Sequence, residues 1–230
     1  MSSSAAGLSV HVHCQAVLFD MDGILISSLG SVERTWTKWS VMRGIDPAYT
    51  RSFAHGRRAI DTLAVLRPDL DSEAELRIVE EMEMADNEGL RVLPGVLDLL
   101  HALPGGRWAV VTSATERLAR ARLAAGGIAA PQRMVTADGV SRGKPHPEPF
   151  LAAAAQLGLP PQQCVVFEDS PSGARAGREA GCTVIATTFS HSMESLDAAH
   201  YHVSDLTGVT AQASSDGLML TLALLTAAPR

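Results

Sequence analysis

Two aspartates one residue apart, Asp20 and Asp22, follow the apolar run 17–19 and precede Gly23. An apolar run that stops at acidic residues is typical of a buried parallel strand, and open α/β folds bind ligands at the carboxyl ends of such strands. Because side chains alternate along a strand, both carboxylates are predicted to face one side, with Met21 pointing away. One could attack an electrophile or hold a hard cation while the other exchanges protons. Taken alone, a strand followed by an Asp-Gly turn is the commoner explanation.

Three later segments also place polar groups next to apolar runs or in stiff loops. Thr112 and Ser113 offer a hydroxyl and free N–H groups to an anion, although a plain helix N-cap explains Ser113 equally well. Lys144 lies in a loop with three prolines, which would hold its ammonium group where a phosphoryl oxygen could bind; a solvated loop lysine is the ordinary alternative. Glu168 and Asp169 repeat the first pattern, and two acid pairs in one sheet predict a shared magnesium ion.

The elements that must position these groups alternate from residue 94 onward. Repeated strand-helix units of this length imply a parallel, doubly wound α/β sheet. The stretch 217–226 is apolar and fits an edge strand or a helix equally well. The predicted strands are 107–112, 134–136, 163–167 and 183–187, and the predicted helices are 96–103, 113–125, 149–157 and 171–180.

Between residues 28 and 90 no segment is a convincing strand, so an all-helical insert is predicted directly after the first strand. A helix over about 31–43 places Trp36 and Trp39 on one face, where core packing is favoured over stacking on a ligand. A second helical segment opens near 55–61, and a third begins at Asp71 or Ser72. Sequences that match capping boxes are Ser72 with Glu75 and Ser113 with Glu116.

The composition indicates an ordinary soluble globular protein. Its 230 residues are 46% hydrophobic and 19% charged, enough for one substantial core or a core with an insert. The net charge of -6 argues against partners such as nucleic acid or anionic membrane. No apolar run reaches the roughly 18 to 20 residues that span a bilayer.

The cysteine count and the first residues favour a cytoplasmic location. Cys14, Cys164 and Cys182 are odd in number and lack paired spacing, so reduced core thiols are expected rather than disulfides or a zinc site. Residues 1–8 lack the basic and long apolar regions of a secretory signal and are predicted to form a loose tail.

As a set, the motifs resemble the haloacid dehalogenase superfamily, in its phosphatase and β-phosphoglucomutase-like branch with a helical cap. The resemblance covers nearly the whole chain. More narrowly, the chain is similar to glycerol-phosphate and 2-deoxyglucose-6-phosphate phosphatases at 55–61 (HGRRAID), 108–113 (WAVVTS) and 136–140 (TADGV). The four superfamily motifs are matched, in order, by 19–23 (FDMDG), 111–114 (VTSA), 143–150 (GKPHPEPF) and 166–173 (VFEDSPSG).

The resemblance implies a Rossmann-like core domain made of residues 1–27 and 93–230, with an α-helical cap domain over 28–92 that closes on the substrate and excludes water. Two residues depart from the family pattern. Ile24 replaces the usual Thr or Val and is expected to affect packing. Ser27 replaces the usual Asp. The serine hydroxyl can still cap a helix, but the negative charge beside the hinge to the cap is lost. Cap closure, more than the chemical step, is therefore where this chain is expected to differ.

The resemblance also implies catalytic roles. Asp20 would attack phosphorus and become an aspartyl phosphate, while Asp22 would protonate the leaving alcohol and then take a proton from the hydrolytic water. Mg²⁺ would be held by Asp20, the main-chain oxygen of Asp22 and Asp169, with Glu168 bound directly or through water. Residues implied to hold the phosphoryl group are Thr112, the N–H of Ser113, and Lys144, and those implied to contact the rest of the substrate are His55 with Arg57 or Arg58. For these three cap residues, an exposed basic helix end is an equally good explanation.

The function implied is a magnesium-dependent phosphatase acting on a small phosphorylated sugar or polyol. A β-phosphoglucomutase-like mutase is the alternative, since it differs only in returning the phosphoryl group to a sugar instead of water. A dehalogenase is disfavoured because halide displacement needs no acid such as Asp22. A receiver-type signalling module fits neither the length nor the insert, and an inert ligand-binding relic would not need all four motifs. The oligomeric state is open and compatible with a monomer, and the particular ester depends on cap geometry.

Overall fold

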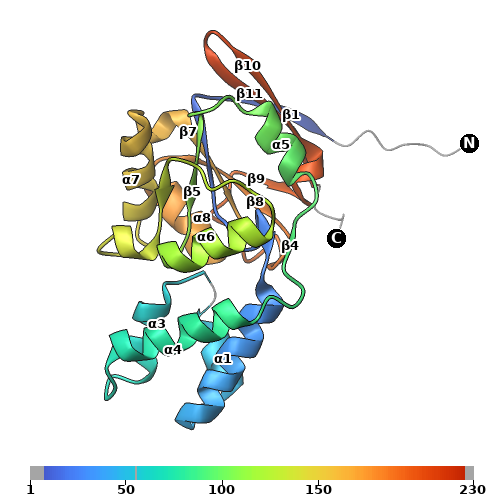
Figure 1. The fold of residues 1–230 in the computed structure, drawn as a ribbon. Helices are drawn as coiled ribbons and strands as arrows, with labels where there is room; N and C mark the ends of the chain where they lie inside the picture. The colour runs from blue at the N-terminus through green and yellow to red at the C-terminus, as the bar shows by residue number, and fades with distance from the viewer. Residues whose placement is uncertain (1–7, 55, 226–230) are drawn as a thin grey trace, which may run out of the picture.

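The central element is a six-stranded parallel sheet (Figure 1). The computed structural model describes residues 8–54 and 56–225. All five neighbouring strand pairs are parallel, which confirms the predicted sheet. In spatial order the strands are β6 (Met134–Val135), β5 (Trp108–Val111), β2 (Ala16–Phe19), β7 (Cys164–Glu168), β8 (Thr183–Thr187) and β9 (Tyr201–Val203).

Helices cover both faces of this sheet. Along β2 the side chains alternate, so Val17 and Phe19 pack on one face and Ala16 and Leu18 on the other. The first face is covered by α5 (Val96–Ala102) and α6 (Glu116–Ala125), and the second by α7 (Glu148–Leu157) and α8 (Pro171–Glu179). This arrangement confirms the doubly wound fold. Three short 3₁₀ helices are Ala137–Gly139, Pro161–Gln163 and Leu206–Gly208.

A second, antiparallel sheet closes the end of the core that lies away from the cap helices (Figure 1). Its strands are β1 (Ser9–Cys14), β11 (Gly217–Ala223) and β10 (Val209–Ser214), with β11 in the middle. β1 and β10 were not predicted, and the open question for 217–226 is resolved as a strand over its described part. The buried side chains of this sheet, among them Leu220, join the core cluster that contains Val17.

The insert between β2 and α5 is a layer of four helices (Figure 1). The chain enters it through β3 (Ile26–Ser27) and leaves through β4 (Arg91–Val92), which pair antiparallel. Trp36 and Trp39 pack edge to face, with ring centroids 5.6 Å apart, in the hydrophobic cluster of this layer. Core packing is therefore confirmed for both. The helices are α1 (Leu29–Arg43), α2 (Pro47–Ala54), α3 (Ala59–Leu66) and α4 (Ser72–Ala85), of which α2 was not predicted.

Helix α4 begins at Ser72, the second of the two predicted positions. Asp71 is the N-cap, and its Oδ1 accepts hydrogen bonds from the N–H groups of Glu73 and Ala74. The capping box of Ser72 with Glu75 is wrong, because Glu75 instead accepts two hydrogen bonds from Arg43 within the cap.

The start of α6 also differs from the prediction. The N-cap is Thr115, whose Oγ1 accepts from the N–H of Leu118, so the box of Ser113 with Glu116 is wrong. Ser113 stays in the turn that leaves β5, where its hydroxyl has another partner described below. The predicted N-cap Ser170 is confirmed, since its Oγ accepts from the N–H of Gly173.

The three cysteines are buried and unpaired, as expected. Burial raises the pKa of the Cys14 and Cys182 thiols to about 12, so both stay protonated at neutral pH. In the described part of the chain, none of the helices combines the length and apolar character needed to cross a bilayer.

Candidate active site

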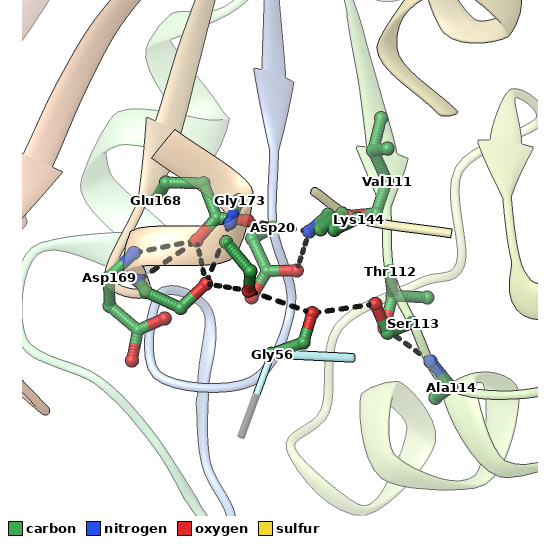
Figure 2. A network of polar contacts seen from close by, with 12 residues as sticks. Asp20, Gly56, Val111, Thr112, Ser113, Ala114, Lys144, Glu168, Asp169 and Gly173 are labelled. Atoms are coloured by element: carbon green, nitrogen blue, oxygen red, sulfur yellow. Dashed lines mark hydrogen bonds and ion pairs between the residues drawn. The ribbon is translucent and has the colours of Figure 1, made fainter. Parts of the chain in front are cut away.

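The predicted site residues of the core meet at the carboxyl edge of the parallel sheet, where Figure 2 shows Asp20, Thr112, Lys144, Glu168 and Asp169. Asp20 directly follows β2, Thr112 follows β5, and Glu168 and Asp169 stand at the end of β7. Lys144 comes from the loop after β6 and reaches the same place. β2 lies between β5 and β7, where the direction of winding reverses, and this switch point is where doubly wound sheets bind ligands.

The Lys144 ammonium group is buried among oxygen atoms. Its Nζ lies 2.5 Å from Asp20 Oδ1, 2.6 Å from Glu168 Oε1 and 2.9 Å from the main-chain oxygen of Val111. Burial alone would lower the pKa of Lys144, but the two carboxylates outweigh it and raise that pKa above its ordinary value. The ammonium therefore keeps its charge beside Asp20. Lys144 is only 3% exposed, so the alternative of a solvated lysine in a loop is wrong.

Asp20, Glu168 and Asp169 form an acidic cluster that fits a divalent cation. One carboxylate oxygen of each lies within 4.8 Å of the others. Burial raises the pKa of Asp20 to about 8 and that of Asp169 well above its ordinary value; Lys144 offsets part of this, and neighbouring carboxylates add to it. Asp169 Oδ2 is buried without a hydrogen-bond partner among residues 8–54 and 56–225. Crowded carboxylates with an unsatisfied buried oxygen are suitable ligands for Mg²⁺.

Gly23 makes room for this cluster. Its φ is +84°, and a Cβ at this position would lie 1.9 Å from Asp169 Oδ2. Only glycine allows the chain after Asp22 to pass so close to the second acid pair.

Glu168 has a different environment from Asp169. Its Oε2 accepts from the main-chain N–H of Asp169 and from both the N–H and Oγ of Ser170, each at 3.0 Å, while Oε1 accepts from Lys144. Both carboxylate oxygens are therefore already occupied by protein donors. Glu168 holds Lys144 and the turn into α8, and Asp20 and Asp169 are better placed as direct ligands.

The turn after β5 contacts the cap segment at Gly56 (Figure 2). The hydroxyls of Ser113 and Ser172 both donate to the main-chain oxygen of Gly56, at 3.2 Å each. Thr112 Oγ1 accepts from the N–H of Ala114, which leaves its own proton for a phosphoryl oxygen. Gly56 thus ties the cap to the core beside the expected phosphoryl position.

Of the three cap residues predicted to contact substrate, the structure places one at a cavity. Arg57 is exposed and lines it. Arg58 is buried elsewhere: it pairs with Asp61 at 2.7 Å and donates to main-chain oxygens of the loop 140–141, so it fastens the start of α3 to the core. His55 lies outside the described residues.

The cavity lies between the cap and the core and has a volume of about 110 Å³. Asp20, Thr112 and Asp169 line it from the core. The cap contributes mainly apolar side chains, among them Trp36, and two carboxylates. The residues of α4 that line the cavity are Leu76, Val79, Glu80 and Glu83.

Three residues around Asp22 were missed by the sequence analysis. Asp22 Oδ1 accepts from Ser28 Oγ at 2.5 Å and from Arg122 Nη1 at 2.9 Å, and Arg122 Nη2 lies 3.4 Å from Glu83 Oε2. The N-cap position of α1 is Ser28, with no side-chain cap bond, so the expectation that Ser27 caps this helix is wrong.

Ile24, the other residue that departs from the family pattern, has its expected role in packing, because its side chain is fully enclosed in the core.

The sequence did contain an indication of the role of Arg122: it is a lone arginine on the apolar face of α6, beside Leu118 and Leu123.

Comparison with known proteins agrees with this geometry. A family model described as haloacid dehalogenase-like hydrolase matches residues 14–181. The chain therefore belongs to the haloacid dehalogenase-like hydrolase family, which confirms the resemblance and the expectation of an enzyme.

Several curated relatives are phosphatases. The chain is 43% identical to hexitol phosphatase A of Escherichia coli (strain K12), over 76% of this chain and 83% of that protein. It is 36% identical to glycerol-1-phosphate phosphohydrolase 2 of Saccharomyces cerevisiae (82% and 80% covered) and 32% identical to 2-deoxyglucose-6-phosphate phosphatase 2 of the same yeast (84% and 88% covered). The structure of β-phosphoglucomutase from Clostridium difficile shares the fold, with a TM-score of 0.72 at 22% identity and coverage of 84% and 92%.

The Gly56 contact provides a first prediction. We expect Gly56→Ala to lower kcat/KM by about 10-fold, because a side chain at φ +72° is strained and its Cβ would lie 2.4 Å from Ser172 Oγ. Gly44→Ala is the matched control: its φ is +69°, but a Cβ there meets nothing within 4 Å. Steady-state kinetics and thermal unfolding of both variants separate backbone strain from loss of the cap contact. Equal activity in the two variants would contradict a role for this approach.

Proposed function

We propose that this protein is a Mg²⁺-dependent phosphatase that hydrolyses a small phosphorylated sugar or polyol through an aspartyl phosphate on Asp20. The observation that carries the proposal is the environment of Asp20: the ammonium of Lys144 lies 2.5 Å from one oxygen, and the unsatisfied Oδ2 of Asp169 belongs to the same cluster. A carboxylate can approach a phosphate dianion only where cations neutralise the charge of the phosphoryl oxygens.

The protein groups then have separate tasks. Asp20 forms the bond to phosphorus, while Lys144, the hydroxyl of Thr112 and the N–H of Ser113 bind the phosphoryl oxygens. Asp22 gives a proton to the departing alcohol and takes one from the water that cleaves the intermediate. Asp20, Asp169 and the main-chain oxygen of Asp22 would hold Mg²⁺, which would supply positive charge to the phosphoryl group.

The inserted helices act as a cap over this site. We assign residues 28–92 to the cap and 1–27 with 93–230 to the core, and the paired strands β3 and β4 mark the two crossings. Contact of Gly56 with Ser113 and Ser172 closes the site above the sheet edge. Closure excludes bulk water while the nucleophile reacts.

The cavity and the relatives support this substrate class. A small volume suits a substrate of few carbon atoms, and the cap carboxylates of α4 can accept hydrogen bonds from hydroxyl groups. Curated relatives are named for hexitol phosphate, glycerol 1-phosphate and 2-deoxyglucose 6-phosphate. Arg57, at the cavity, is the cap cation proposed to contact the substrate, and Arg58 has a structural task.

The test is phosphate release from a panel of glycerol phosphates, hexitol phosphates, 2-deoxyglucose 6-phosphate and β-glucose 1-phosphate, with and without Mg²⁺. We expect Mg²⁺-dependent release, with one polyol or sugar ester preferred. Formation of glucose 6-phosphate from the 1-phosphate without release would establish the mutase instead. Absence of both reactions would refute the proposed function.

A second prediction concerns Mg²⁺ and stability. Because the pKa of Asp20 is raised from 3.8 to about 8 in the folded protein without metal, the fold binds this proton more tightly than the unfolded chain does. This contribution to stability is present below pH 3.8 and is lost as the pH rises toward 8. Mg²⁺ replaces the proton, so we expect it to raise the unfolding temperature more at about pH 8 than at about pH 5.5. Differential scanning fluorimetry with Mg²⁺ or EDTA measures this, and an equal shift at both pH values would contradict it.

A further inference from the structure

Arg122 is a buried cation on α6 that the proposed chemistry has not used. Its side chain is 5% exposed, and it lines the cavity between the cap and the core. Nη1 donates to Asp22 Oδ1 at 2.9 Å. Nη2 is buried and makes no hydrogen bond within the described part of the chain, although Glu83 Oε2 lies 3.4 Å away. Burying a guanidinium is costly unless its charge is balanced, and the two carboxylates balance it here.

The contacts of Asp22 distinguish its two oxygens. Ser28 Oγ and Arg122 Nη1 both donate to Oδ1. An oxygen that already accepts two hydrogen bonds, one from a cation, is a poor site for a proton. The proton that Asp22 transfers is therefore best carried by Oδ2, and the orientation of the carboxylate depends on the two donors.

Arg122 also connects this carboxylate to the cap. Asp22 belongs to the core, whereas Glu83 is on α4 of the cap, and the two carboxylates flank one guanidinium. Burial raises the pKa of Glu83 to about 7, while Arg122 lowers it. Glu80, which is also on α4, does not replace Glu83 in this contact, because its carboxylate accepts hydrogen bonds from Thr115 and Arg117.

We infer that Arg122 is a positioning residue for leaving-group protonation: it fixes Oδ1 of Asp22 so that Oδ2 can reach the departing oxygen, and Glu83 completes this arrangement when the cap is closed. The inference rests on the proposed function. As Asp20 bonds to phosphorus, the ester P–O bond breaks, its electron pair stays on the alcohol oxygen, and that oxygen takes the proton from Asp22. In the second step water attacks phosphorus and gives a proton to Asp22, while the bond from Asp20 to phosphorus breaks and its electron pair returns to the Asp20 carboxylate.

Esters that differ in leaving group provide a specific readout. A polyol phosphate has a poor leaving group that must be protonated, whereas the phenolate of p-nitrophenyl phosphate departs without a proton. For Arg122→Gln we expect kcat/KM, which reports the step that forms the phosphoenzyme, to fall about 10²-fold with the polyol ester that the wild type prefers, the size of a lost general acid, but by less than about 5-fold with p-nitrophenyl phosphate. A merely structural role would lower both rates equally.

The matched control is Arg117→Gln. Arg117 is on the same helix and also pairs with α4, through Glu80 and Glu81, but it is about half exposed and does not contact Asp22. We expect both rates to stay within about 2-fold of wild type, as is usual for exposed ion pairs. If Arg122→Gln does not fold, Arg122→Lys keeps the charge but contacts one carboxylate at a time, and the same unequal loss, about 10-fold with the polyol ester, is expected.

Glu83→Gln tests the cap half of the arrangement. We expect it to slow the polyol ester about 10-fold and to add nothing when combined with Arg122→Gln, since residues that act as a unit are non-additive. Equal losses on both esters in the Arg122 variants, or no loss, would overturn the positioning role, and additive losses would overturn the link to Glu83. If the wild type released no phosphate from any ester, the proposed function itself would fail, which is a different outcome.

Discussion

Replacement of Asp20 with asparagine is expected to reduce phosphate release by at least about 10⁴-fold, because an amide oxygen cannot form the acyl phosphate and the other site groups provide no nucleophile. The loss should be the same for polyol and p-nitrophenyl esters, in contrast to the Arg122 variants. Incubation with substrate and acid quenching, followed by mass spectrometry, should detect a phosphorylated peptide containing Asp20 in the wild type and none in the variant.

The same substitution should not unfold the protein. Burial raises the pKa of Asp20 to about 8, so the neutral asparagine removes a carboxylate that is costly to ionise, and its oxygen can still accept from Lys144. We expect the variant to be at least as stable as the wild type in EDTA. Asp98→Asn, at an exposed position on α5, serves as the control for activity. Phosphate release retained by Asp20→Asn would require another nucleophile and would refute the covalent mechanism.

Lys144→Met is expected to affect both activity and stability strongly. The ammonium donates to Asp20 Oδ1, Glu168 Oε1 and the main-chain oxygen of Val111, and methionine removes this donor from all three buried oxygen atoms. Removing one member of a buried ion pair costs about 3 to 5 kcal/mol, and loss of a charge that stabilises the transition state costs about 10² to 10³ in kcat. Chemical denaturation in EDTA and steady-state kinetics in Mg²⁺ measure the two effects.

Two comparisons make the Lys144 result specific. Arg142→Gln removes an exposed cation from the same loop, one that pairs with Glu148 at 3.6 Å, and should leave activity and stability nearly unchanged. Mg²⁺ should restore part of the stability of Lys144→Met, because it neutralises the carboxylates that the lysine leaves unpaired. Full activity in Lys144→Met would show that the ammonium group is not needed at the phosphoryl oxygens.

The sequence by itself determined the parallel sheet and the position of the site. Strands β2, β5, β7 and β8 are short apolar runs with turn residues at their ends, and such local patterns are readable because a strand buried on both faces must be apolar throughout. The polar groups that follow these strands must then meet, since parallel strands point their carboxyl ends to one edge. Asp20 and Asp169 could be placed together on this argument although they follow different strands that are far apart in the sequence.

Tertiary structure decided what depends on contacts between distant segments. β1 pairs with β11 across about two hundred residues, so its short alternating sequence has no local signal strong enough to identify a strand. Arg57 and Arg58 are neighbours in the sequence, yet Arg58 binds the core loop while Arg57 lines the cavity. The path of the chain after α2 determines which of the two side chains faces the cavity.

The environment of Asp22 depended on tertiary structure for the same reason. Ser27 was expected to cap α1, yet Ser28 occupies the N-cap position and its hydroxyl contacts Asp22. Arg122 reaches the same carboxylate from a helix one hundred residues away. The motifs identify which groups react. The packing of the cap against the core decides which groups orient the reacting ones, because a buried charge pairs with an oppositely charged group that the folded chain places next to it.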